Sequence, residues 1–131
     1  MLDECLGRYA VRRVLEDAGE RVEVHADHFR PGTPDDELIP AVAAHGWIFV
    51  TKDKAIRRHS AEYQAVTASR AAVLILTGKD MSGRASGEAL VKAMPRLRRL
   101  LGGHDRPFVA TISRSGGIVI RSGRRLAAGK R

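Results

Sequence analysis

The fold is decided by residues 46–53, whose sequence is GWIFVTKD. Within this segment, Trp47–Val50 is a run of β-forming residues that is too short for a helix. Gly46 marks the end of the preceding segment, and Thr51, Lys52 and Asp53 follow the run at once. We therefore predict a short strand over Trp47–Val50, with Asp53 just beyond its carboxyl end.

Helical and strand patterns alternate on both sides of this strand. Apolar residues at helical spacing predict helices, and short apolar or alternating runs predict strands. The predicted helices cover residues 11–18, 34–44, 55–68 and 88–101, and the other predicted strands cover residues 21–25, 71–76, 108–112 and 118–120. We predict an α/β fold, a three-layer α/β/α sandwich whose central sheet is mostly parallel and ends in a C-terminal hairpin.

The chain of 131 residues has the length of one domain. We expect residues 1–120 to form that domain and residues 121–131, which are basic and rich in Gly and Ala, to form a flexible tail. Hydrophobic residues make up 44% of the chain, which is enough for a core and excludes wholesale disorder. The sequence has no apolar run near the ~20 residues of a membrane span, no signal-peptide pattern and a single cysteine. We expect a cytoplasmic protein without membrane association.

The charge is unevenly distributed along the chain. The whole sequence has 23 Lys and Arg against 15 Asp and Glu, a net charge of +8. Residues 1–56 contain 7 basic and 11 acidic residues, a net charge of −4, whereas residues 57–131 contain 16 basic and 4 acidic residues, a net charge of +12. Either the domain has an acidic and a basic face, or its acids form a functional cluster in a protein that otherwise attracts anions.

Several acids lie where elements of the predicted fold end or begin. Asp3 follows the two residues that could form a first strand, Asp53 follows the strand at Trp47–Val50, and Asp35 opens a helix. Functional groups gather at the carboxyl ends of parallel strands. Two carboxylates about 4 Å apart repel by about 4 kcal/mol at an effective dielectric constant near 20, so such a cluster requires a cation. Mg²⁺ or Mn²⁺ fits, and in a basic protein such a cation points to phosphodiester chemistry.

Asp35, its neighbour Asp36 and Asp53 also have structural explanations. Thr33, Pro34 and Asp36 match the N-cap, the first helical position and the acidic position of a capping box, which requires no catalytic role for Asp36. Asp35 suits the dipole of the same helix, and Asp53 could be the N-cap of the next one. The spacing of the residues leaves these alternatives open.

Four segments of the sequence stand out together: Asp3-Glu4-x-Leu6, Asp27-His28-Phe29, Thr33–Leu38 and Gly46–Asp53. They resemble segments of the small PIN-like domains, most closely the branch grouped with VapC-type toxins of bacterial toxin–antitoxin systems. The resemblance extends over about residues 1–101. The resemblance implies a ribonuclease that depends on Mg²⁺ or Mn²⁺, with RNA, a protein antitoxin and a second copy in a homodimer as partners. It implies that Asp3, Asp35 and Asp53 are the catalytic metal ligands, supported by Thr51 and Asp36.

Basic residues follow the last of these acids. Lys54, Arg57 and Arg58 come just after Asp53, where we predict contacts to the phosphates of RNA. Aromatic residues make up 5% of the chain, too few to favour recognition by base stacking. RNA binding is therefore predicted to depend on phosphates and shape.

Two other functions compete with the nuclease. A receiver-like phospho-switch would use Asp3 and Glu4 as its acid pair and Asp53 as the phosphate acceptor. A catalytically degraded PIN-like module would only bind a partner or RNA, and the two residues before Asp3 support it because they make a very short first strand. Cys5 has no evident base partner, so nucleophilic catalysis by a thiol is not indicated.

Overall fold

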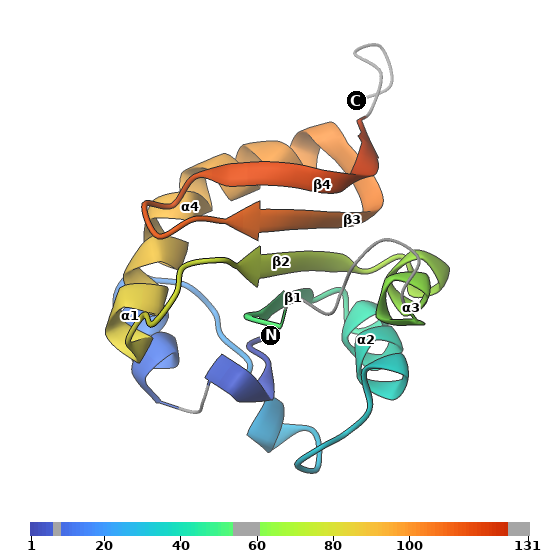
Figure 1. Ribbon diagram of the computed structural model, residues 1–131, viewed down its shortest axis with the longest axis horizontal. Helices are drawn as coiled ribbons and strands as arrows, with labels where there is room; N and C mark the ends of the chain where they lie inside the picture. Colours follow the sequence, from blue (N-terminus) through green and yellow to red (C-terminus); the bar gives the residue numbers. More distant parts are fainter. Residues whose placement is uncertain (7–8, 54–60, 126–131) are drawn as a thin grey trace.

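The computed structural model describes residues 1–6, 9–53 and 61–125 of the 131-residue chain. Within these residues a four-stranded sheet has the order β1-β2-β3-β4 (Figure 1). Its strands are β1 (Ile48–Thr51), β2 (Ala72–Leu76), β3 (His104–Ile112) and β4 (Ile118–Arg125). The first three strands are parallel, and β4 pairs with β3 as an antiparallel hairpin. The predicted parallel sheet with a C-terminal hairpin is confirmed.

Helices cover both faces of this sheet. One face carries α1 (Ala10–Asp17) and α4 (Gly83–Gly103), and the other carries α2 (Asp35–Ala44) and α3 (Ala61–Ser69) (Figure 1). Strand β2 is buried throughout, with Ala72, Leu74 and Leu76 in the core beneath α1 and α4 and Val73 and Ile75 in the core beneath α2 and α3. The fold is therefore the expected three-layer α/β/α sandwich.

The first residues of the chain extend the sheet beyond β1. Leu2 forms parallel bridges to Val24 on one side and to Val50 on the other. The predicted strand over residues 21–25 is wrong, because the chain turns directly after the bridge at Val24 into a 3₁₀ helix, η2 (His25–Asp27). Leu2 exchanges hydrogen bonds with Glu23 and His25, and beyond them the N–H groups of Asp27 and His28 bond locally to the carbonyls of Val24 and His25.

The start of α2 differs from the predicted capping box. Pro34 occupies the N-cap position, and no side chain caps the helix. The Thr33 hydroxyl instead donates to the Arg30 carbonyl at 2.6 Å, so it stabilises the preceding turn. Because the helix begins one residue later than predicted, Asp36 is not the partner of a capping threonine.

The C-terminal elements are longer than predicted. Helix α4 begins at Gly83, and the Ala85 N–H donates to the Ser82 hydroxyl at 3.0 Å, a serine cap that the apolar pattern does not show. Strand β3 begins at His104, and β4 continues to Arg125, into residues expected to form a tail. Residues 126–131 lie outside the described chain, as do residues 55–60 of the helix predicted over 55–68.

The two helices on the α1 face approach each other closely at Gly87. A Cβ atom on this residue would lie 2.7 Å from the Val14 Cβ atom of α1, closer than real Cβ contacts. Glycine is therefore needed for this helix pair to pack at its observed distance. No helix in the described chain has both the length and the apolar character that crossing a membrane requires.

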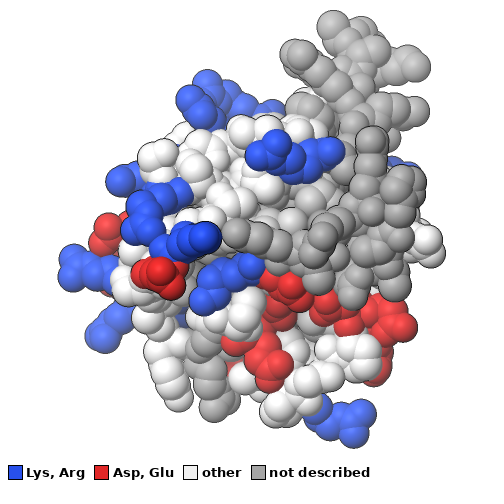
Figure 2. Space-filling model, in the orientation of Figure 1, with Lys and Arg blue, Asp and Glu red and all other residues white. Residues whose placement is uncertain are grey.

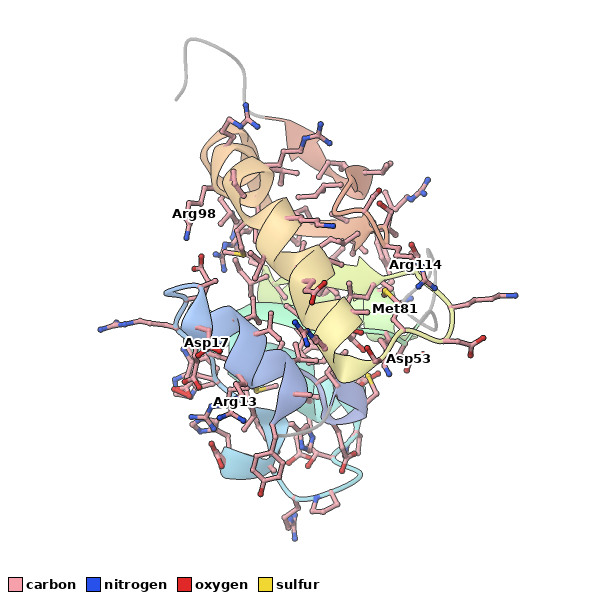
Figure 3. The ribbon with its side chains drawn as sticks, turned by 90° about the vertical axis from the view of Figure 1, so that its left-hand side faces the viewer. Arg13, Asp17, Asp53, Met81, Arg98 and Arg114 are labelled. Carbon is pink, nitrogen blue, oxygen red and sulfur yellow. The ribbon has the colours of Figure 1, made fainter. Side chains whose placement is uncertain are left out.

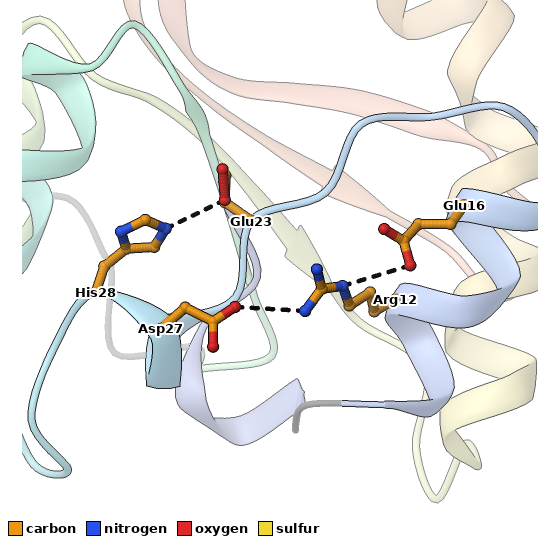
Figure 4. Close-up of polar contacts among 5 residues, drawn as sticks. All are labelled: Arg12, Glu16, Glu23, Asp27 and His28. Carbon is orange, nitrogen blue, oxygen red and sulfur yellow. Dashed lines mark hydrogen bonds and ion pairs between the residues drawn. The ribbon is translucent and has the colours of Figure 1, made fainter.

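Polar contacts join α1 to the segment that carries η2. Arg12 pairs with Asp27 at 3.3 Å and with Glu16 at 3.4 Å, and His28 lies 3.1 Å from a Glu23 oxygen (Figure 4). These side chains are largely solvent-accessible, and such pairs contribute at most about 1 kcal/mol each. The apolar cluster beneath α1 therefore contributes more than these pairs to holding the segment in place.

Candidate functional site

The connections of the sheet reverse direction at Leu2, which identifies the site. From Leu2 the chain runs to Val24 on one side of it and only later to Val50 on the other side. In open α/β sheets, ligands bind at the carboxyl ends of the strands beside such a switch point. Asp3 is the residue after Leu2, and Thr51 is the last residue of β1, so both lie at this position.

The Thr51 hydroxyl connects the two ends of the chain that meet here. Thr51 is completely buried, and its Oγ1 donates to the Asp3 Oδ2 atom at 2.7 Å. The same oxygen accepts the backbone N–H of Asp53 at 3.0 Å. The Asp3 N–H also donates to the Val50 carbonyl at 2.8 Å. The structure thus brings Asp3 and the backbone of Asp53 together, as the strand-end argument predicts, with the Thr51 hydroxyl between them.

The other oxygen of Asp3 is held by its own neighbour. Asp3 Oδ1 accepts the Glu4 N–H at 2.8 Å, at the start of the 3₁₀ helix η1 (Glu4–Leu6). The Glu4 carboxylate in turn accepts the N–H of Gly32 at 3.2 Å. Gly32 belongs to the loop before α2, so this bond connects the approach to Asp35 with the segment that carries Asp3. Glu4 therefore has a positioning contact that sequence analysis missed.

Cys5 is the second side chain at the site that sequence analysis missed. Its Sγ atom lies 3.6 Å from Asp3 Oδ2 and 3.6 Å from Thr51 Oγ1, and it accepts the Lys52 N–H at 3.4 Å. Partial burial of the sulfur raises the pKa of the Cys5 thiol, although the Lys52 N–H bond acts in the opposite direction. Cys5 is thus an exposed residue whose thiol lies beside the carboxylate with a raised pKa, a position that its spacing from Asp3 in a 3₁₀ turn could have suggested.

The remaining predicted site residues have different surroundings. Asp35 is the half-buried first residue of α2, whereas Asp36 is exposed and lines the groove between α2 and α3. Asp53 is exposed, and Figure 3 places it on the same side of the molecule as Met81 and Arg114. Lys54, Arg57 and Arg58, the predicted phosphate contacts, lie outside the described residues.

The donor set suits a hydrated hard cation better than a closed metal cage. Within the described chain, no group of three or more His, Cys, Asp or Glu side chains is arranged to hold a metal ion. Mg²⁺, however, keeps several waters and is bound by one or two carboxylates together with substrate phosphates. Asp3, whose carboxylate accepts the Thr51 hydroxyl, and Asp53, whose backbone N–H donates to it, are the acids that would supply such carboxylates.

Comparison with known families identifies the domain. The sequence matches the family model described as a PIN-like domain over residues 1–78. Comparisons with curated proteins and with solved structures gave no match. The matched residues contain Asp3, Asp35, Thr51 and Asp53, together with the whole switch point. Since the match covers more than half of the 131 residues, the chain belongs to the family of PIN-like domains.

Proposed function

We propose that this PIN-like domain is a metal-dependent endoribonuclease that hydrolyses RNA phosphodiester bonds. The observation that carries the proposal is the Thr51 hydroxyl, which links the Asp3 carboxylate to the backbone of Asp53 at the switch point of the sheet. Family membership supports a nuclease, because such domains are commonly nucleases. The net charge of +8 supports a polyanionic substrate.

Each residue of the site would have its own role in metal binding or in positioning. Asp3, Asp53 and Asp35 would hold Mg²⁺ or Mn²⁺, and the bound ion would lower the pKa of a water and stabilise negative charge on the phosphate. The Thr51 and Glu4 hydrogen bonds fix the two oxygens of Asp3, so one carboxylate is oriented before the cation arrives. The exposed position of Asp53 leaves it accessible to a large substrate.

We further propose that the enzyme is the toxin of a type II toxin–antitoxin pair and acts in the cytoplasm. This part of the proposal rests on the resemblance of residues 1–101 to VapC-type toxins. It implies a protein antitoxin that covers the acidic site, and a homodimer as the assembled form. Co-expression with the product of a neighbouring open reading frame, followed by purification of the complex, tests it directly.

The nuclease is tested by cleavage of a labelled RNA with Mg²⁺ or Mn²⁺, with and without EDTA. We expect cleavage that EDTA abolishes and that Asp53→Asn lowers by about two orders of magnitude, the usual scale for losing a group that acts on the reacting atoms. Asp17→Asn is the matched control, because it makes the same change at an exposed position of α1. Cleavage that persists in EDTA and in the Asp53 variant would contradict the mechanism.

One observation favours a second candidate, a PIN-like module that binds RNA without cutting it. Within the residues described, the acids do not form a group of three that could hold a metal ion. RNA binding in EDTA without any cleavage in Mn²⁺ would support this module. The receiver-like switch is disfavoured by the family match, and phosphorylation of Asp53 by acetyl phosphate would be its signature.

A further inference from the structure

The C-terminal part of the chain carries the positive charge. Residues 1–78, which match the family, contain 10 basic and 12 acidic residues, a net charge of −2. Residues 79–131 contain 13 basic and 3 acidic residues, a net charge of +10. Residues 79–131 therefore carry the excess positive charge of the chain, and this charge suits an anionic partner.

Three of these cations surround one turn at the carboxyl edge of the sheet. We define the turn surface by Lys79 in the β2–α4 loop, Lys92 on α4 and Arg114 in the β3–β4 turn, all of which are exposed. Arg114 donates from Nη2 to the Lys79 carbonyl, which joins the two loops. Figure 2 shows Lys and Arg gathered on the side of the molecule where Figure 1 places this turn and the start of α4.

Two hydrogen bonds and a close contact with α4 fix the turn that carries Arg114. The Ser113 N–H donates to the Gly117 carbonyl at 2.9 Å, and the Gly117 N–H returns to the Ser113 hydroxyl at 3.0 Å. Gly116 has a positive φ of 85° and packs so closely on α4 that a Cβ atom would lie 2.6 Å from that of Lys92. Lys92 is thereby fixed beside the turn, and the base of the Arg114 side chain has little freedom.

The cations of the turn surface form no close ion pair with acids of the described chain, although the exposed Asp80 follows Lys79 in the sequence. Arg84 pairs with Glu88 and Arg98 pairs with Glu20, whereas Lys79, Lys92 and Arg114 form no ion pair with any described residue. Arg114 uses one of its N–H groups on a neutral carbonyl, which leaves its charge uncompensated. Unpaired guanidinium and ammonium groups are the side chains that bind phosphates.

The strand register gives an approximate distance between Ser113, at the base of the turn that carries Arg114, and Asp53 at the candidate active site. Thr51 pairs with Ile75, and Ile75 pairs with Thr111, so Asp53 and Ser113 each lie two residues beyond the same row. Neighbouring strands are about 4.8 Å apart, so two steps from β1 to β3 span about 10 Å.

We infer that the turn surface binds the phosphate backbone of RNA about 10 Å away from the bond cut at Asp53. The inference rests on the proposed function only in taking RNA as the substrate. It assigns RNA binding to residues outside the family match, so the C-terminal part positions a strand across the carboxyl edge of the sheet. Because the contacts are to phosphates, the surface favours RNA over a neutral ligand without selecting a base sequence.

The test is equilibrium binding of a fluorescent ten-nucleotide oligouridylate in EDTA, measured by anisotropy at several salt concentrations. The variant Lys79→Gln with Arg114→Gln should bind on the order of tenfold more weakly, with a salt-dependence slope smaller by about 1.4, about 0.7 for each lost contact to a single strand. The control is Arg96→Gln with Arg99→Gln, which makes the same charge change on the second half of α4. This part of the helix lies toward the amino ends of the parallel strands. The control variant should keep the slope of the unmodified protein.

Equal losses of RNA affinity and of salt-dependence slope in both double variants would overturn the inference. RNA would then be attracted by the overall positive charge and not by the turn surface. Lys79→Gln alone is the safeguard against misfolding, since that side chain makes no hydrogen bond within the described structure, and it should lower the slope by about 0.7. Competition by polyglutamate as strong as that by polyuridylate would assign the surface to an acidic polypeptide instead. Binding in EDTA without cleavage in Mn²⁺ would contradict only the proposed nuclease, whereas cleavage with an unchanged slope in the double variant would contradict only the turn surface.

Discussion

The hydroxyl of Thr51 donates a hydrogen bond of 2.7 Å to the carboxylate of Asp3, and this bond joins the first residues of the chain to the end of β1. The hydroxyl also accepts the backbone N–H of Asp53, so a single buried oxygen is bonded both to the Asp3 carboxylate and to the backbone that carries Asp53. A buried group with two such partners is costly to remove, because each partner loses its own hydrogen bond.

Thr51→Val should therefore impair both stability and activity. Valine keeps the shape of threonine but leaves Asp3 Oδ2 and the Asp53 N–H without this oxygen, at a cost of about 1–3 kcal/mol in the free energy of unfolding. We expect metal-dependent cleavage to fall about tenfold, because the Asp3 carboxylate loses its orientation. Urea unfolding and a cleavage assay measure the two effects. Thr51→Ser restores the hydroxyl and should recover most of both, and full activity in the valine variant would show that the bond has no role.

The thiol of Cys5 should react slowly with alkylating agents. The thiolate is the reactive form, and burial raises the pKa of Cys5, so less thiolate is present at pH 8 than in a free cysteine. We expect iodoacetamide to modify the folded protein several-fold more slowly than N-acetylcysteine amide, and urea-unfolded protein at the rate of the free thiol. Mass spectrometry follows the reaction without ambiguity, since the chain has 1 cysteine. Equal rates for folded and unfolded protein would contradict the raised pKa of the thiol.

The amino group of Met1 should make stability depend on pH in a chain that begins with this residue. Burial lowers the pKa of the Met1 ammonium from 8.0 to about 6, although it donates to the Ile48 carbonyl. Between pH 6 and 8 the unfolded chain binds more protons than the folded one, so stability rises with pH, by up to about 3 kcal/mol. Urea unfolding at pH 6, 7 and 8 measures this rise. Acetylation of the amino group removes the titration and should remove most of the slope, and the same slope after acetylation would assign it to other groups.

Sequence analysis predicted well those elements whose residues fit only one kind of secondary structure. Strand β2 is apolar at every position, and a run of this kind fits only a strand buried on both faces. The segment around Val24 alternates like a strand, yet it forms only one bridge, because its pairing depends on Leu2, a residue far away in the sequence. Alternating apolar residues indicate which side chains face a core. They do not indicate how many residues of the segment form backbone hydrogen bonds to a neighbouring strand.

The same distinction applies to the candidate site. Asp3 and Asp53 were predicted to face the same crevice because strand ends lie side by side, and the structure connects Asp3 to the backbone of Asp53 through the Thr51 hydroxyl. Cys5 was dismissed for lack of a partner, but its partners are the predicted site residues themselves, which only the three-dimensional arrangement reveals. Asp36 was explained by a cap that does not form, since Pro34 rather than Thr33 takes the N-cap position.

Two glycines of α4 should respond in opposite directions to replacement by alanine. Gly87→Ala places a methyl group 2.7 Å from the Val14 Cβ atom, and we expect a loss of about 1–3 kcal/mol as α1 and α4 separate. Gly102→Ala meets nothing within 4 Å, and alanine there should stabilise the protein by up to about 1 kcal/mol. Thermal unfolding of both variants measures the difference. A Gly87 variant as stable as the Gly102 variant would show that the helix pair can adjust freely.

Asp35 and Asp36 should differ in their effect on cleavage although they are neighbours in the sequence. Both lie in the first turn of α2, so replacing either by asparagine removes a similar favourable interaction with the helix dipole, about 0.3–1 kcal/mol. Asp35 is half-buried, and the loop before it is bonded to Glu4 beside Asp3, whereas Asp36 lines the groove against α3. We therefore expect Asp35→Asn to lower Mn²⁺-dependent cleavage by about two orders of magnitude and Asp36→Asn to change it by less than about twofold. Because the two variants should unfold at similar urea concentrations, a difference in cleavage reports on the site and not on stability. A larger loss in the Asp36 variant would move the third metal ligand to that residue and would require the first turn of α2 to rotate toward Asp3 when the cation binds.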